Sequence, residues 1–115
     1  MGLFRRRGED DAARLDARAM RALERRGVDL SNPLRVVHRM NFPDRHTAEA
    51  AAATLRDEGW SVATDAMAFG SGSVVRAERE RVLTPASCAA DRERFQALVR
   101  AGAGDYDGWE ATPAA

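Results

Sequence analysis

The chain has 115 residues, 44% of them hydrophobic and 31% charged, which is enough for one domain with one modest core. All 18 basic residues are arginines, and 18 acidic residues balance them to a net charge of zero. This balance disfavours a protein that binds nucleic acid through the phosphate backbone. The single cysteine excludes an internal disulfide, and no stretch is apolar enough to span a membrane. We therefore expect a cytoplasmic protein of one domain.

The N-terminal segment differs in charge from the rest of the chain. Residues 1–27 contain eight arginines and five acids, whereas residues 33–115 contain ten arginines and twelve acids. We divide the chain into a basic N-terminal helix with its linker, residues 1–32, and a compact domain, residues 33–115. Neither charge imbalance is large enough to predict a nucleic-acid partner.

The composition predicts that the N-terminal helix runs from Asp10 to Arg26 and ends at Gly27, since glycine readily adopts the conformation that terminates helices. Its apolar stripe is narrow and consists of Leu15, Ala19, Ala22 and Leu23. So narrow a stripe leaves three possibilities open. The helix packs on the body of the domain, packs on another subunit, or stays free.

Alternation of apolar and polar residues begins at Leu34 and predicts a strand to Phe42. The elements predicted after it, in chain order, are a helix over Arg45–Glu58, a strand over Trp60–Thr64, a hairpin loop over Asp65–Gly72, a strand over Ser73–Leu83, a helix from Pro85 to Gly102, and a strand over Tyr106–Ala111.

The predicted order is one helix followed by β-α-β-β-α-β. This order indicates an α+β ferredoxin-like sandwich, a four-stranded antiparallel sheet with two helices on one face, plus the extra N-terminal helix. Right-handed crossovers place the first and third strands in the centre of the sheet, with the last strand beside the first.

Three segments carry a resemblance to a known family: LERRGVDLSNPLRVVH, FPDRHTAEAAAATLRDEGWSV and GDYDGWEA. They resemble the regulator of ribonuclease E activity B family (RraB), the ribonuclease E inhibitor proteins of bacteria. The most specific piece is the signature Tyr106-Asp107-Gly108-Trp109. The resemblance implies the same fold and a role as a regulator that docks on its partner. The Arg-rich N-terminal segment departs from the acidic N-terminal helix of the well-studied members.

The signature also predicts a site. In a regular strand, Tyr106 and Gly108 share one face and Asp107 and Trp109 share the other. Tyr106 is expected to point to the helices and pack with Phe95 and Leu98, with Gly108 leaving room for it. Trp109 and Asp107 are then expected on the open face of the sheet, beside two arginines of the first strand, Arg35 and Arg39. Such a cluster is either a protein-binding anchor or a tryptophan that merely shields the sheet.

The sequence offers little chemistry for an enzyme. His38 lies on the apolar face of the first strand and is expected to be a hydrogen-bonded core residue, and Cys88 falls on the core stripe of the last helix. His46 and Glu49 share one helix face but lack further ligands for a metal. No nucleotide-binding or catalytic motif is present, and Gly70-Ser71-Gly72 is expected to be a simple hairpin turn. We expect no catalytic residue, no metal and no cofactor.

Three functional hypotheses follow. The first is a non-catalytic regulator that binds a protein partner, an endoribonuclease of the ribonuclease E type or another RNA-processing factor. The second is a small-ligand-sensing or homo-oligomeric structural domain of the same fold without a nuclease link. The third is a direct RNA binder, which is disfavoured because the exposed face of the central strands carries no aromatic residue for base stacking.

Overall fold

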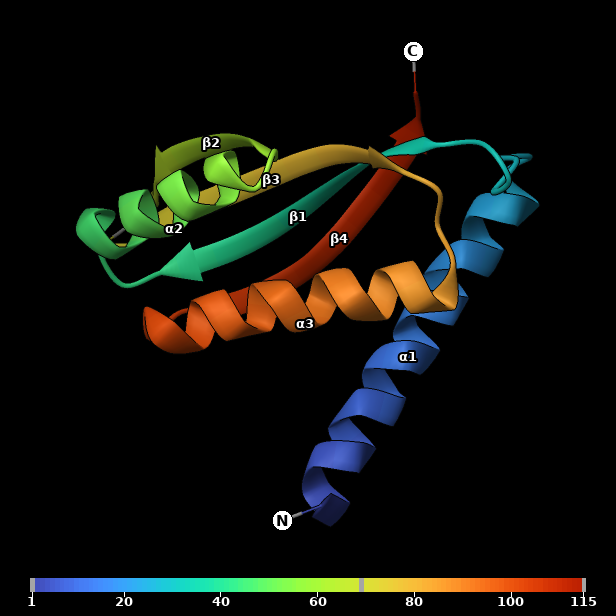
Figure 1. The fold of residues 1–115 in the computed structure, drawn as a ribbon, viewed down its shortest axis with the longest axis horizontal. Coiled ribbons are helices and arrows are strands. Elements are labelled where there is room, and N and C mark those ends of the chain that lie inside the picture. The colour runs from blue at the N-terminus through green and yellow to red at the C-terminus, as the bar shows by residue number, and fades with distance from the viewer. Residues whose placement is uncertain (1, 69, 115) are drawn as a thin grey trace.

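The computed structural model describes residues 2–68 and 70–114. The chain forms three helices and four strands in these residues (Figure 1), with the order and bounds α1 Gly2–Arg25, β1 Leu34–Phe42, α2 Arg45–Asp57, β2 Ser61–Ala66, β3 Ser73–Arg81, α3 Pro85–Ala101 and β4 Asp105–Pro113.

The strands form one antiparallel sheet in the order β2-β3-β1-β4. The strands β1 and β3 are central and β4 lies beside β1, so the predicted ferredoxin-like topology is confirmed. Figure 1 shows α2 and α3 on the same side of the sheet. The side chains of β1 alternate between buried and more exposed along its whole length, because only one face is covered.

The start of α1 differs most from prediction, whereas the strand bounds differ by at most two residues: β2 covers Ser61–Ala66 rather than Trp60–Thr64, and β3 ends at Arg81 rather than at Leu83. The helix α1 begins at Gly2 rather than at Asp10, because one glycine at position 8 costs a helix only about 1 kcal/mol among good helix formers. The strand β4 extends beyond the predicted Tyr106–Ala111 at both ends, to Asp105 and Pro113. Its partner β1 has nine residues of backbone to pair with, and this pairing decides the length of β4.

The main core lies between the sheet and the helices α2 and α3. A capping side chain precedes each helix: Asp44 accepts from the Thr47 N–H at 2.8 Å, and Thr84 accepts from the Ser87 N–H at 3.0 Å. The small residues of α2 let that helix approach the sheet closely. The buried members of this core are Met40, Phe42, Ala48, Ala51, Leu55, Trp60, Val75, Ala77, Phe95 and Val99.

A second, smaller core lies under the C-terminal half of α1, which packs against α3 and the adjoining end of the sheet. Its buried members are Leu23, Leu34, Val36, Leu83 and Cys88. The first of the three possibilities for α1 therefore holds, since the helix packs on the body of the domain. Figure 1 shows that its N-terminal half extends away from the other elements.

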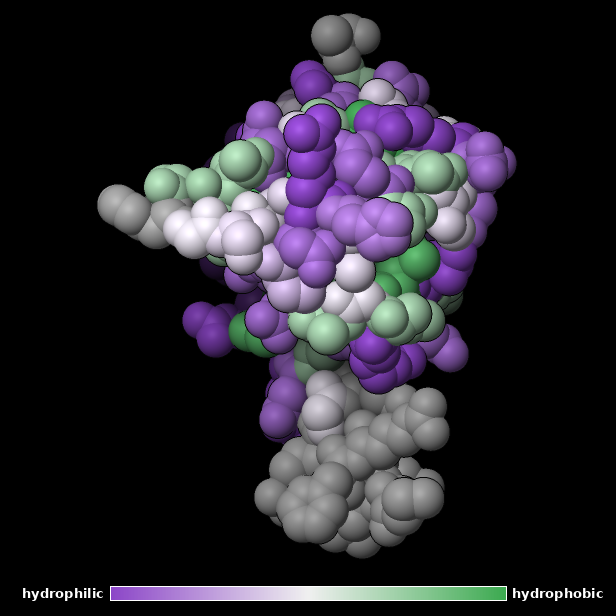
Figure 2. All heavy atoms as spheres, turned by 90° about the vertical axis from the view of Figure 1, so that its left-hand side faces the viewer, coloured by the Kyte–Doolittle hydropathy of each residue, from purple (hydrophilic) through white to green (hydrophobic). Residues whose placement is uncertain are grey.

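The predicted apolar stripe of α1 is only partly buried, because its member Leu23 faces the domain and its member Leu15 does not. Leu15 is 63% exposed, whereas its neighbour Asp16 is only 9% exposed and faces the domain together with Leu23. Exposed apolar residues are scattered elsewhere too. Figure 2, which views the molecule from the end where β1 and α3 finish, shows hydrophilic residues across the middle and hydrophobic ones in separate small patches.

Candidate protein-binding surfaces

A β-bulge in β4 determines which way the signature residues point. His38 of β1 pairs with Trp109, and Met40 pairs with Tyr106, so the one residue of β1 between these pairs is opposed by two residues of β4. Gly108 lies in the bulge with φ +91°, a conformation that glycine adopts without strain. The extra residue breaks the alternation, and Tyr106 and Trp109 end on the same, helix-covered face.

The prediction that Trp109 points to the open face was therefore wrong. Its ring packs against the smaller core, and its Nε1–H donates to Asp16 Oδ1 at 2.9 Å. The other carboxylate oxygen of Asp16 forms an ion pair with Arg92 of α3. Asp16 thus joins three elements distant in sequence, α1, α3 and β4, which fixes α1 on the domain.

Tyr106 lies where the sequence predicts, facing the helices. Its ring is parallel to that of Phe95 with centroids 5.9 Å apart, and Leu98 packs against the same core. The expected reason for Gly108 was wrong, because a Cβ at that position would meet no atom within 4 Å. The structure requires glycine there for its backbone conformation and not for space.

His38 is a buried, hydrogen-bonded core residue, as predicted. It is 2% exposed, its ring stacks on Phe95 at 4.3 Å, and its Nδ1 lies 2.7 Å from the Tyr106 hydroxyl. Within the described residues its Nε2 has no hydrogen-bond partner, and the nearest carboxylate oxygen, on Asp91, is 3.9 Å away. Burial lowers the pKa of His38 to about 4 despite the opposing effect of Asp91, so the imidazole is neutral at pH 7.

The other groups around His38 are also held inside the domain. Asp91 accepts two hydrogen bonds from the guanidinium of Arg81, at 3.1 and 2.7 Å. Burial raises the pKa of the Cys88 thiol to about 11, and burial likewise raises the pKa of Tyr106. A thiol that stays protonated is a poor nucleophile, so this cluster is suited to packing rather than to reaction chemistry.

The opposite face of the sheet is open. A shallow hollow of about 390 Å³ lies across its strands, and its rim is charged. Arg35 forms an ion pair with Glu78, and Arg76 with Asp65, while Arg39 lies 3.6 Å from Glu110. The residues lining the hollow are Arg35, Val37, Arg39, Ser61, Val62, Ala63, Arg76, Glu78 and Glu110.

The predicted site residues are therefore divided between the two faces. Arg35 and Arg39 lie on the open face as expected, and Trp109 lies on the other side of the sheet. Asp107 is exposed within the bulge, and no ion pair in the described part of the chain joins it to either arginine. The predicted Asp–Arg pair is absent there, and Glu110 lies beside Arg39 in its place.

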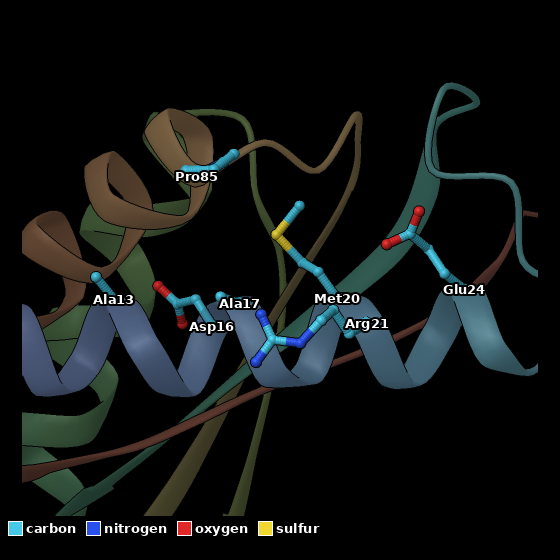
Figure 3. Close-up of a pocket in the computed structure, with 7 residues that line it drawn as sticks. All are labelled: Ala13, Asp16, Ala17, Met20, Arg21, Glu24 and Pro85. Carbon is cyan, nitrogen blue, oxygen red and sulfur yellow. The ribbon is translucent and has the colours of Figure 1, made fainter.

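A second concave surface lies between α1 and the start of α3 (Figure 3). It encloses about 210 Å³ and is lined mainly by apolar groups. Met20 points from α1 toward Pro85, and Ala13 and Ala17 line the same side of α1. Sequence reasoning missed this groove, although the small residues at i and i+4 on α1 were a signal for it.

Comparison with known families agrees with this fold and signature. Residues 14–111 match the family described as RraB, regulator of ribonuclease activity B. A comparison with curated proteins found no match. Among the described helices, none has the length and apolar character needed to cross a membrane. The matched range includes the docked half of α1, the strands β1 to β3 and β4 as far as Ala111 with its bulge, and the chain therefore belongs to the RraB family of regulators of ribonuclease activity.

Proposed function

We propose that this protein is a non-catalytic regulator that binds an endoribonuclease of the ribonuclease E type and changes its activity by occupying part of its surface. Family membership supports the regulation of ribonuclease activity. Protein docking as the mechanism, and this enzyme as the partner, are our proposal. We include a cytoplasmic location in it, since a free buried thiol such as Cys88 is typical of a reducing compartment.

The open face of the sheet is the observation that carries the proposal. Four strands present this face without a covering helix, and the hollow across it is rimmed by Arg35 and Arg39. Arginine is among the residues that contribute most to protein interfaces, because its planar guanidinium binds carboxylates and stacks on aromatic rings. Val37 supplies an apolar patch between the two arginines.

The state of the ionisable groups supports a non-catalytic role. His38, Cys88 and Tyr106 are enclosed in the cores, where burial shifts each pKa in the direction that keeps the side chain neutral. The acids Asp16 and Asp91 are engaged by arginines. A reaction would need at least one such group to reach a substrate.

The test is binding of the full chain to a purified ribonuclease E-type enzyme, measured by calorimetry together with cleavage of a fluorogenic RNA. We expect micromolar or tighter binding and reduced cleavage. The double variant Arg35→Glu/Arg39→Glu should weaken binding about tenfold or more, which corresponds to about 1.4 kcal/mol. Both side chains are exposed, so this variant should fold normally.

A matched control makes the same charge change on the helix side, at two exposed positions, Arg45→Glu/Arg100→Glu. It should bind as the natural chain does. If the natural chain does not bind the enzyme, the proposed function is wrong. If it binds and both double variants bind equally well, the function stands and the open face is not the docking surface.

A further inference from the structure

The outer face of α1 carries a row of arginines. Arg14, Arg18, Arg21 and Arg25 follow one another at spacings of four, three and four residues, so they lie on one side of the helix. All four are exposed. The buried residues Asp16 and Leu23 lie on the opposite side. With a rise of 1.5 Å per residue, the row is about 16 Å long.

Most of this row is not neutralised within the chain. Arg14 pairs with Asp11 at 3.2 Å. Among the side chains that the structure describes, no carboxylate pairs with Arg18, Arg21 or Arg25. The net charge of zero therefore conceals a local excess of positive charge on α1, balanced by an acidic body.

An apolar groove runs alongside this row. It is the concave surface between α1 and α3, and Arg21 forms part of its edge (Figure 3). Ala13 and Ala17 leave room beside the helix, and Met20 closes the side toward Pro85. The Asp16 carboxylate in its wall is already occupied by Arg92 and Trp109. The groove thus offers apolar contact next to unpaired guanidinium groups.

We propose that the arginine row and the adjoining groove bind an acidic amphipathic segment of a protein partner. Its carboxylates pair with Arg18, Arg21 and Arg25, and its apolar side chains enter the groove beside Met20. Nucleic acid fits less well, since a phosphate backbone has no apolar group to enter the groove beside Met20. The inference rests on the proposed function and names the chemistry of a second contact in the same complex.

The probe is a fluorescein-labelled peptide of about 18 residues, or five helical turns, with glutamates on one face and leucines on the other. Binding to the full chain is followed by fluorescence anisotropy at low and at near-physiological salt. We expect saturable binding that weakens with added salt, because the paired charges are exposed. A peptide with glutamine in place of glutamate should bind at least about tenfold more weakly.

Two variants test the two halves of the surface. Arg18→Glu/Arg21→Glu should weaken peptide binding about tenfold or more, while Arg45→Glu/Arg100→Glu, with the same charge change elsewhere, should not. Ala13→Phe partly fills the groove and should weaken binding, while Ala50→Phe, an exposed site on α2, should not. Circular dichroism verifies that each variant keeps its helices.

Three results would overturn the inference. The acidic peptide does not bind, the arginine variant and its control bind it equally, or an oligouridine RNA of similar length binds more tightly than the peptide. None of these results bears on whether the chain binds a ribonuclease, which the calorimetry above measures independently. The two proposals can therefore fail separately.

Discussion

Each face of the sheet carries an arginine paired with a carboxylate, but one pair is buried and the other is exposed. On the helix-covered side, the side chains of Arg92 and Asp16 are each only 12% exposed. On the open side, those of Arg39 and Glu110 are 44% and 74% exposed. Both pairs bring a guanidinium to a carboxylate, but only the first pair is withdrawn from water.

This difference decides what each pair contributes. Removing one partner from a buried pair leaves an unpaired charge and costs about 3–5 kcal/mol, whereas exposed pairs contribute about 0–1 kcal/mol. The covered face therefore holds α1 in place, and the open face is free to change its charges without loss of the fold. If the open face is the ribonuclease-binding surface, as we propose, stability and that contact depend on different sides of one sheet.

The largest expected effect is that of Trp109→Ala. The substitution removes packing in the smaller core and leaves Asp16 without its indole donor, which should cost about 3 kcal/mol and lower Tm by roughly 10 °C. Thermal unfolding followed by circular dichroism measures this. As a control, Trp109→Phe keeps one aromatic ring and loses the donor and part of the indole packing, so its cost should be smaller, about 1–2 kcal/mol.

A different outcome would reverse the comparison. If Trp109→Ala leaves Tm within about 2 °C of the natural chain and abolishes ribonuclease binding, then Trp109 is an interface anchor rather than a structural residue.

His38 should make the covered face sensitive to acid. Its pKa falls from 6.5 to about 4 on folding, because burial disfavours the imidazolium. The unfolded chain therefore binds more protons between these two pH values, and stability is lost as pH falls from about 6.5 to 4, by up to about 3 kcal/mol. Urea unfolding at several pH values should show this loss, and His38→Gln should lack most of it. If the free energy of unfolding falls equally steeply with pH in both proteins, His38 is not the cause.

Substitution of the glycine in the β4 bulge should have an intermediate effect on stability. Gly108→Ala places a side chain at φ +91° and should cost about 1–2 kcal/mol through backbone strain alone, since no atom lies near the added Cβ. Urea denaturation gives the value. Gly8→Ala, in the helix α1, is the opposite control and should be neutral or slightly stabilising. A neutral Gly108→Ala would show that the bulge shifts easily.

The smallest effect is expected on the open face. Arg39→Ala removes one exposed pair with Glu110 and should change stability by less than about 0.5 kcal/mol. The same chemical denaturation experiment applies. A cost above about 2 kcal/mol would mean that the open-face charges stabilise the fold. The contrast drawn between the two faces would then be wrong.

The local pattern of residue types in the sequence was sufficient to predict most of the fold. The strand Leu34–Phe42 is predicted to the residue, because a strand with one buried face alternates without interruption. Threonine followed by proline marks the start of α3, since both residue types satisfy the needs of a helix N-terminus. The strand order then follows from the handedness of the crossovers.

The candidate site depended on long-range geometry, which local pattern does not contain. Asp16 reads as a surface acid beside Leu15, because its partners Arg92 and Trp109 lie 76 and 93 residues away along the chain. The bulge reversed the direction of Trp109, and an isolated glycine within a strand was the available signal for it. The sequence alone shows that the arginines of α1 recur at helical spacing. Their exposure depends on which side of the helix packs on the domain, and the structure was needed to show that side.

The bulge in β4 also disfavours aggregation through edge-to-edge pairing of strands from different copies of the chain. The strand β4 lies at one edge of the sheet, and an edge strand offers unpaired backbone groups to any other extended chain. A bulged strand that ends in proline is a poor template for such pairing, and the opposite edge, β2, has only six residues. Growth of a fibre along β4 would require the backbone at Gly108 to straighten, which would also turn Trp109 out of the smaller core.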